Sequence, residues 1–331
     1  MSHEIKNHDQ VIATSRTWHG LERIVEPEVT KTFAGSPWDY PVLEQDLFDA
    51  DGQKIEGYKH IVAPGLKSVN NVTLQVANAS YGTVQNEALF EALEKGLTGI
   101  DYEITCLGTL KNRRRPFLSL SLKDKQDYLV NGDEFKAHIN LLTSHDGSCS
   151  IRLADSNTRV VCANTFRVAL AERGKSMNIS IRHTSGASAR VDGLADRIEQ
   201  ILLKRDEFFT SLEYLKSIEM SDADGRAFVV GHSVGKNIED ATERAKRPAR
   251  DLIKAFRSGD GNKGETAYDM FNAYTQHWTR KAVVSNAYKN YVSSEFGGGA
   301  DRKAVAYQTL VNDSKRLDTI EAGKKFLMNA C

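Results

Sequence analysis

The densest positive charge in the chain is a run of five residues, Lys111-Asn112-Arg113-Arg114-Arg115, of which four are cations. Segments 102–110 and 116–122 on either side have strand character and pair naturally, so the run is predicted at a hairpin tip. Cations this close together repel one another and are tolerated on a solvated turn or opposite an anion. A protein that neutralises several phosphates releases their counterions, which favours binding at low salt. The run therefore predicts contact with nucleic acid, and a solubilising turn is the alternative.

Further arginines follow on the neighbouring elements. Arg152 alternates with Ile151 and Leu153 along a predicted strand, so it points away from them, toward solvent or a groove. Arg159 and Arg167 lie farther along, and either of them also suits an internal ion pair. The predicted nucleic-acid-binding residues are Lys111, Arg113, Arg114, Arg115, Arg152, Arg159 and Arg167.

His145-Asp146 is the pair most suggestive of acid–base or metal chemistry. Gly147 follows it between two strand patterns, which is a turn signal, so a turn is the preferred interpretation. An unrecognised enzyme site built from this pair with Asn164 and Thr165 is the alternative. The sequence has no HExxH, GxSxG or GxxxxGK[ST] pattern, so we predict no catalytic residue, no metal and no cofactor.

Charge is distributed unevenly, although the 44 basic and 44 acidic side chains give a net charge of zero. Residues 1–110 hold 8 basic and 16 acidic side chains, whereas residues 111–190 hold 14 and 7. Residues 191–331 are almost balanced, with 22 and 21. The basic middle block is either a footprint for a polyanion or the electrostatic partner of the acidic N-terminal third.

The elements that must position these residues fall into three parts. After an N-terminal arm, 1–34, residues 35–185 are predicted to form an α+β core domain with a mostly antiparallel sheet of hairpins and two helices. Asp51-Gly52 is a favoured hairpin turn. The two helices are expected to begin at Asn86, as a capping residue, and at Asn164.

Residues 186–331 are predicted to be all helical. Apolar residues with 3-4 spacing indicate a long helix over 191–217 with a coiled-coil-like face. Further helices are expected over 238–256, 266–291 and 302–328. The first of these three carries a cluster of cations: Arg244, Lys246, Arg247, Arg250 and Lys254.

Cysteine spacing and hydropathy bound the compartment. The four cysteines form no CxxC pair, so they are expected to stay reduced. No apolar run approaches the ~20 residues of a membrane span, and the N-terminus lacks the apolar segment of a signal peptide. We therefore expect a cytoplasmic protein without a membrane partner.

Several motifs together resemble a known family. The segments HDGS (145–148), RVVCANT (159–165) and IRHT (181–184) resemble the phage/plasmid-like proteins of the DUF932 family. Trp18-His19-Gly20 resembles the N-terminal WHG element of that family, and 265–273 resembles its GTAW…NA segment, with Glu265 where glycine is usual. The resemblance implies a mobile-element protein in a host cytoplasm. It carries over no catalytic residues.

The function expected from these features is binding of single-stranded DNA by a phage or mobile-element protein. At the level of architecture, the sheet with a basic hairpin looks similar to ATP-independent single-strand annealing proteins. That similarity implies annealing or recombination by a homo-oligomer. The alternative is a protein-interaction module, either an inhibitor of a host defence enzyme or a virion component, that does not bind nucleic acid.

Overall fold

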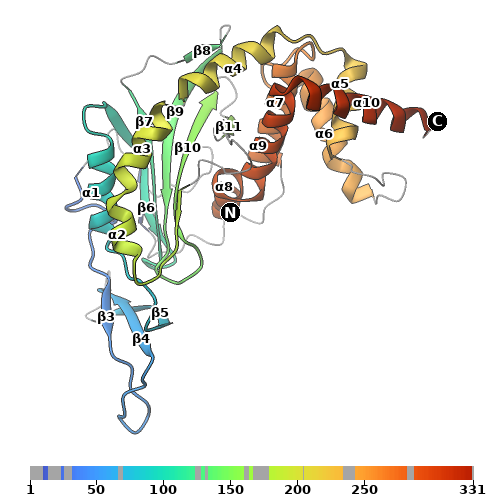
Figure 1. Ribbon diagram of the computed structural model, residues 1–331. Helices are drawn as coiled ribbons and strands as arrows, with labels where there is room; N and C mark the ends of the chain where they lie inside the picture. The colour runs from blue at the N-terminus through green and yellow to red at the C-terminus, as the bar shows by residue number, and fades with distance from the viewer. Residues whose placement is uncertain are drawn as a thin grey trace.

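The structure, a computed structural model, consists of a sheet-rich part followed by a helical part (Figure 1). This α+β architecture confirms the predicted fold class. The residues it describes are 10–13, 24–25, 32–65, 70–123, 128–130, 133–159, 164–166, 179–203, 205–233, 243–281 and 287–329.

The larger sheet has the strand order β11-β10-β9-β7-β6-β1-β2 within the described residues, with β12 also paired to β10 and β8 to β9. All pairings are antiparallel except the one between β1 and β2. The predicted hairpin 102–122 and the hairpin that turns at His145–Gly147 form its centre. The strands are β1 (Gln10–Ala13), β2 (Ile24–Val25), β6 (Tyr102–Leu110), β7 (Arg115–Leu122), β8 (Tyr128–Val130), β9 (Asp133–Leu142), β10 (Ile151–Arg159), β11 (Asn164–Phe166) and β12 (Ile179–Ile181).

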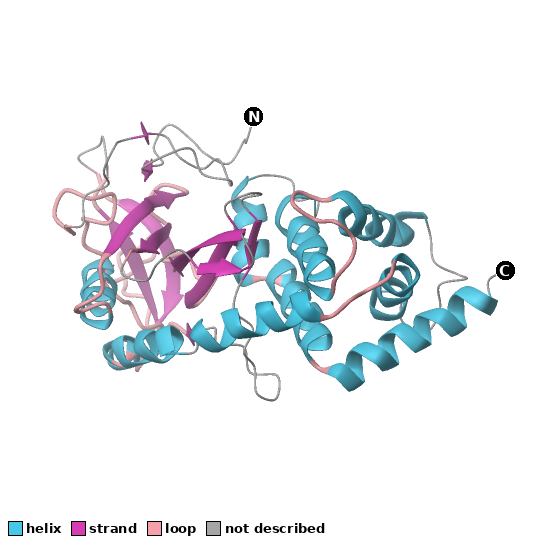
Figure 2. Cartoon of the chain, turned by 90° about the horizontal axis from the view of Figure 1, so that it is seen from above, coloured by secondary structure: helices cyan, strands magenta, loops and turns pink. Residues whose placement is uncertain are grey.

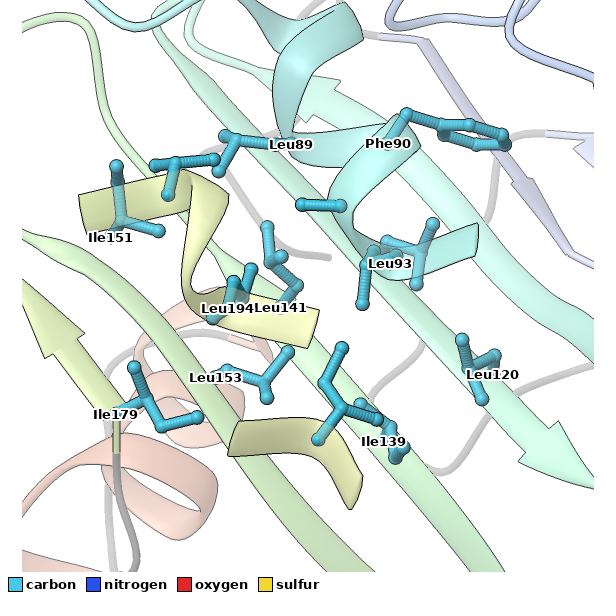
Figure 3. Close-up of a cluster of buried hydrophobic side chains, with 14 of the residues drawn as sticks. Leu89, Phe90, Leu93, Leu120, Ile139, Leu141, Ile151, Leu153, Ile179 and Leu194 are labelled. Atoms are coloured by element: carbon cyan, nitrogen blue, oxygen red, sulfur yellow. The ribbon is translucent and has the colours of Figure 1, made fainter. Parts of the chain in front are cut away.

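One face of this sheet is covered by α1 (Asn86–Gly96), α2 (Ala187–Asp192) and α3 (Leu194–Leu203) (Figure 1). Alternate strand residues point to this face, and apolar helix residues recur every three or four positions, so the two sets meet in one core. Figure 3 shows this core, in which the labelled residues are Leu89, Phe90, Leu93, Leu120, Ile139, Leu141, Ile151, Leu153, Ile179 and Leu194.

A second, three-stranded sheet projects from one end of the molecule (Figure 1). Its strands are β3 (Leu43–Gln45), β4 (Tyr58–Ala63) and β5 (Val72–Asn78). Gly52 adopts φ +77° in the loop between β3 and β4, which confirms the predicted Asp51-Gly52 turn. Its inner face has a small core of its own, formed by Tyr40, Val42, Ile61, Ala63, Leu74 and Ala77.

The helical part surrounds α7 (Ala267–Gln276), whose ten residues are all buried. Thr266 and Asp269 form a reciprocal capping box that starts this helix. The other elements are α4 (Arg205–Ser217), α5 (Asp222–Ser233), α6 (Glu243–Ser258), η2 (His277–Lys281), α8 (Ala287–Phe296), α9 (Gly298–Val311) and α10 (Asp313–Asn329). Figure 2, a view from above, shows these helices set beside the sheet, whose strand β11 contacts both α7 and α8. Among the helices of the described chain, none has both the length and the hydrophobicity of a bilayer span.

Several sequence predictions are wrong in detail. Residues 164–166 form β11, paired with the end of β10, and not the start of a helix, since the strand closes a hairpin there. Asn86 is not a cap: it is the first helical residue, and its side chain turns inward to bond Trp38 O at 3.1 Å. The expected helix over 191–217 is divided, since Gly193 separates α2 from α3. The expected helix over 302–328 is also divided, since Asn312 has an extended backbone and separates α9 from α10.

Candidate nucleic-acid interface

The predicted basic hairpin tip has an unusual backbone. Lys111, Asn112 and Arg113 have φ values of 52°, 56° and 67°, a left-handed conformation that residues with a Cβ seldom adopt. Two hydrogen bonds hold this turn in place. The Tyr40 hydroxyl donates to Arg113 O at 2.7 Å, and the backbone N–H of His145 donates to Arg114 O at 2.7 Å. The surrounding structure therefore fixes the turn from two sides.

The three arginines of the turn, Arg113, Arg114 and Arg115, are called the junction arginines below. Arg113 donates to Pro64 O at 2.8 Å and lies over the Tyr40 ring, with Cζ 4.6 Å from the centroid. Arg114 donates from Nε to Leu74 O at 3.1 Å and from Nη2 to Thr73 O at 2.6 Å. Both side chains are thus bonded to the projecting sheet, and they hold it against the main sheet.

Arg115 bonds in the other direction, to the β9–β10 turn. Its Nε lies 3.1 Å from Asp146 Oδ2, and both side chains are less than one-fifth exposed. Burial opposes ionisation of this carboxyl group, but hydrogen bonds from Ser148 and the charge of Arg115 outweigh it and lower the Asp146 pKa. The junction arginines are therefore half-buried and engaged within the chain, and their contact with nucleic acid stays a prediction.

The remaining predicted residues are spread over the sheet and beyond it. Arg152 is half-buried on the face opposite the main core, as predicted, and donates from Nη1 to Phe296 O at 2.7 Å. Arg159 ends β10 and pairs in register with Asn164. Lys111 is half-buried in the junction turn, and Arg167 lies outside the described residues.

His145 and Asp146 shape a turn, as predicted, since Gly147 follows them at φ +69°. The His145 side chain is 1% exposed, and its Nε2 lies 2.8 Å from Asn86 Oδ1. Burial, together with the nearby His183, lowers the pKa of His145 to about 3. An imidazole with that pKa stays neutral and enclosed at neutral pH, and is unsuited to proton transfer with a substrate.

The alternative enzyme site is not assembled. Asn164 pairs with the last residue of β10, whereas His145 and Asp146 precede its first residue. The nine residues of β10 extend over about 30 Å, so the two pairs lie at opposite ends of the strand. Within the described residues there is also no group of three or more His, Cys, Asp or Glu side chains placed to hold a metal ion.

A cavity of about 280 Å³ lies beside the junction arginines, between the β9–β10 turn, α8 and the first residue of α9. Arg115, Cys149 and Lys289 are among its lining residues. Burial raises the pKa of the Cys149 thiol, so this cysteine is protonated at neutral pH and is a poor nucleophile.

A stronger candidate for contact with a polyanion is a surface that sequence reasoning did not select, on α6. This helix holds six basic and two acidic side chains in sixteen residues. Four of the basic residues are exposed and recur at i, i+3, i+7 and i+10, which places them on one face. These four are called the α6 cations: Arg247, Arg250, Lys254 and Arg257.

The α6 cations form a stripe along one face of the helix, and packing of the opposite face determines that the stripe points toward solvent. Leu252, Ala255 and Phe256 are buried in the core of the helical part. Phe256 packs on Gly225 of α5, where an added Cβ would lie 2.5 Å from the ring. Because one side of the helix is bound tightly to α5 and α7, the stripe is held toward solvent.

Arg257 also has a partner, because two of its nitrogens bond both carboxylate oxygens of Asp222, with Nη2–Oδ2 at 2.8 Å. Both side chains are about half exposed, so this pair orients the guanidinium without removing it from solvent. The sequence contained the signal for the stripe. Cations and buried apolar residues alternate in α6 with helical period, whereas the junction run has only local charge density.

Comparison with known proteins identifies one family. The family model described as Domain of unknown function (DUF932) matches residues 73–310, which include both the junction and α6. No curated protein matches the chain, and no solved structure does.

Proposed function

We propose that this chain, which belongs to the DUF932 family, binds the phosphates of nucleic acid through the α6 cations. The observation that supports the proposal is the alignment of four exposed cations on one helical face in a protein whose net charge is zero. A stripe of one sign on a neutral protein concentrates potential at one place, and does not merely raise the overall charge.

The dimensions of the stripe suit a polyanion. Ten residues separate Arg247 from Arg257, and at 1.5 Å per residue the stripe extends over about 15 Å. Phosphates of one strand are spaced by roughly 3.4 Å along a duplex axis, so several of them can face the stripe at once. Arginine also presents paired N–H groups to a phosphate, which gives geometry as well as charge.

Single-stranded DNA is the form that we propose, and annealing of complementary strands is the proposed outcome. Two strands repel each other through their phosphates, and a cationic surface that neutralises part of that charge lowers the barrier to pairing. The α6 cations lie on an exposed face of their helix, which an extended strand can follow.

Binding is tested with a labelled oligonucleotide by fluorescence anisotropy over a salt series. The test variant is Arg247→Gln, Arg250→Gln and Lys254→Gln; its matched control, with the same loss of charge, is Lys95→Gln, Arg197→Gln and Lys315→Gln, three exposed cations on α1, α3 and α10.

Each phosphate contact on a single strand contributes about 0.7 to the slope of log K against log salt. Loss of three contacts should therefore reduce the slope by about 2 and the affinity near 0.1 M salt by roughly 100-fold. The control should lose only a small part of that. Equal loss in both variants, or no binding by the wild type at low salt, would refute the proposal.

The alternative function, an interaction module that does not bind nucleic acid, predicts no anisotropy change at any salt concentration. An annealing assay with two complementary oligonucleotides, each labelled for energy transfer, then separates binding from annealing. Faster pairing with wild type than with the α6 variant is the expected result.

A further inference from the structure

The outer face of the projecting sheet exposes several large apolar side chains. Strand register places Leu43, Tyr58 and Val76 on the same face, because Val76 pairs with His60 and Leu43 pairs with Val62 on β4. Their exposed fractions are 39%, 54% and 55%. Phe48 and Ile55, in the loop beyond these strands, are 57% and 38% exposed. Five of the nine exposed large hydrophobic residues of the described chain thus lie on this sheet or in its β3–β4 loop, and a concentration of this kind marks a docking surface.

The same segment is strongly acidic. Residues 43–58, called the acidic hairpin below, hold five carboxylates and one lysine. Lys54 pairs with Asp46, and Lys59 of β4 pairs with Glu44. The acidic hairpin therefore combines exposed aromatic rings with an excess of negative charge. Nucleic acid is excluded as its partner by charge, and so is a second acidic hairpin.

A surface of aromatic rings and carboxylates is suited to arginine-rich helices. Guanidinium groups stack on the faces of Tyr and Phe rings while they pair with carboxylates, and their alkyl stems cover apolar surface. This chain carries such a helix, α6, with a net charge of +4, and the acidic hairpin has a net charge of −4. Figure 1 shows the projecting sheet and α6 in separate parts of the molecule, with the main sheet between them. The two surfaces do not meet within one chain.

We propose that the acidic hairpin of one copy docks on the α6 cations of a second copy, in a head-to-tail contact. Such a contact joins two different surfaces, so a pair of copies still has one unoccupied acidic hairpin and one unoccupied set of α6 cations. Association therefore continues into a ring or a chain of copies. The proposal does not depend on the proposed nucleic-acid function. Because both use the α6 cations, a bound oligonucleotide and a docked neighbour exclude each other.

A charge-swap experiment tests this contact by sedimentation velocity of the full chain at low salt. One variant reverses the hairpin with Asp46→Lys, Asp51→Lys and Glu56→Lys. It spares Asp49, whose carboxylate accepts the N–H groups of Asp51 and Gln53 within the turn. The other variant reverses α6 with Arg247→Glu, Arg250→Glu and Lys254→Glu.

Wild type should sediment as species larger than the 36.8 kDa chain, and each variant alone should sediment at that mass. An equal mixture of the two variants should associate again, because the basic hairpin of one then faces the acidic helix of the other. All six sites are exposed, so melting curves should stay within about 0.5 kcal/mol of wild type and exclude unfolding as the cause.

Monomeric wild type would overturn the contact, and so would a mixture that fails to associate. Oligonucleotide binding by dilute wild-type chain is measured separately, so either result leaves the nucleic-acid proposal standing or falling by its own assay.

Discussion

Two clusters of arginine in this chain have opposite structural settings. The junction arginines lie on a turn between two sheets, and their guanidinium groups bond backbone carbonyls or a carboxylate. The α6 cations lie on a helix whose other face is buried, so their side chains project into solvent. Charge density along the sequence is higher in the junction, yet the surface available to an anion is larger on α6. The difference shows that the structural element on which cations lie, more than their density along the sequence, decides whether they are exposed to an anion in solution.

The largest expected effect separates the two clusters by stability. Replacing the junction arginines with alanine removes the bonds to Pro64, Thr73 and Leu74 and leaves Asp146 without its ion pair. The free energy of unfolding should fall by roughly 3 to 5 kcal/mol, because partly buried charged hydrogen bonds are lost. Urea denaturation measures this, and the α6 glutamine variant should remain within about 0.5 kcal/mol of wild type. If the junction variant unfolds like wild type but no longer binds oligonucleotide, the assignment of the two clusters is reversed.

A second comparison uses pH, because the imidazole of His145, next to the junction arginines, is almost fully buried, whereas the α6 cations include no histidine. Unfolded His145 binds a proton below about pH 6.5, whereas the folded protein keeps it neutral to about pH 3. The unfolded state therefore binds more protons in this window, and the free energy of unfolding falls as the pH is lowered from 6.5 toward 3. The loss is on the order of a few kcal/mol, at about 1.4 kcal/mol per pKa unit.

His145→Gln keeps a polar group for Asn86 and should flatten this pH dependence in urea denaturation series. His60→Gln is the matched control, since His60 is half-buried on the projecting sheet. An unchanged slope in His145→Gln would show that other groups of the junction carry the proton uptake.

A third comparison concerns competition for α6. If oligonucleotide and the acidic hairpin use the same cations, a short single strand should convert the associated species of wild type to complexes that contain one chain each. Sedimentation with absorbance at the label wavelength measures both partners at once. Persistence of the associated species with oligonucleotide bound would place the two ligands on different surfaces.

Much of the sheet could be predicted, because its hairpins are local. Asp51-Gly52 and Asp146-Gly147 each place a glycine at positive φ between two strand patterns, which is a signal contained in a few residues. The prediction was wrong at Asn164, where strand or helix is decided by pairing with the end of β10 and not by local propensity.

The helical part shows a different limit. Residues 186–331 are predicted to be all helical, but none of the individual helices predicted there includes α5, whose two glycines weaken the helical pattern. In the structure α5 and α10 approach each other closely at their glycines. A Cβ on Gly231 of α5 would collide with Thr319 O of α10, and a Cβ on Gly323 of α10 would collide with Ala227 O of α5. Prediction of the candidate site from the sequence was limited in a similar way by tertiary packing. The helical period of α6 is present in the sequence, but the packing of its apolar face on α5 and α7, which leaves the cations exposed, is a tertiary fact.

The smallest expected effect tests one hydroxyl group, that of Tyr40, which donates a hydrogen bond to the turn of the junction arginines. Tyr40→Phe keeps the ring under Arg113 but removes the hydrogen bond to Arg113 O, so that a carbonyl of the strained turn loses its donor. The free energy of unfolding should fall by about 1 kcal/mol, the usual contribution of one such bond. Tyr58→Phe, on the exposed face of the projecting sheet, is the matched control. It should leave the free energy of unfolding unchanged when both variants are measured by urea denaturation. Equal stability of Tyr40→Phe and wild type would mean that the guanidinium contacts of the junction arginines hold the turn without the help of this hydroxyl.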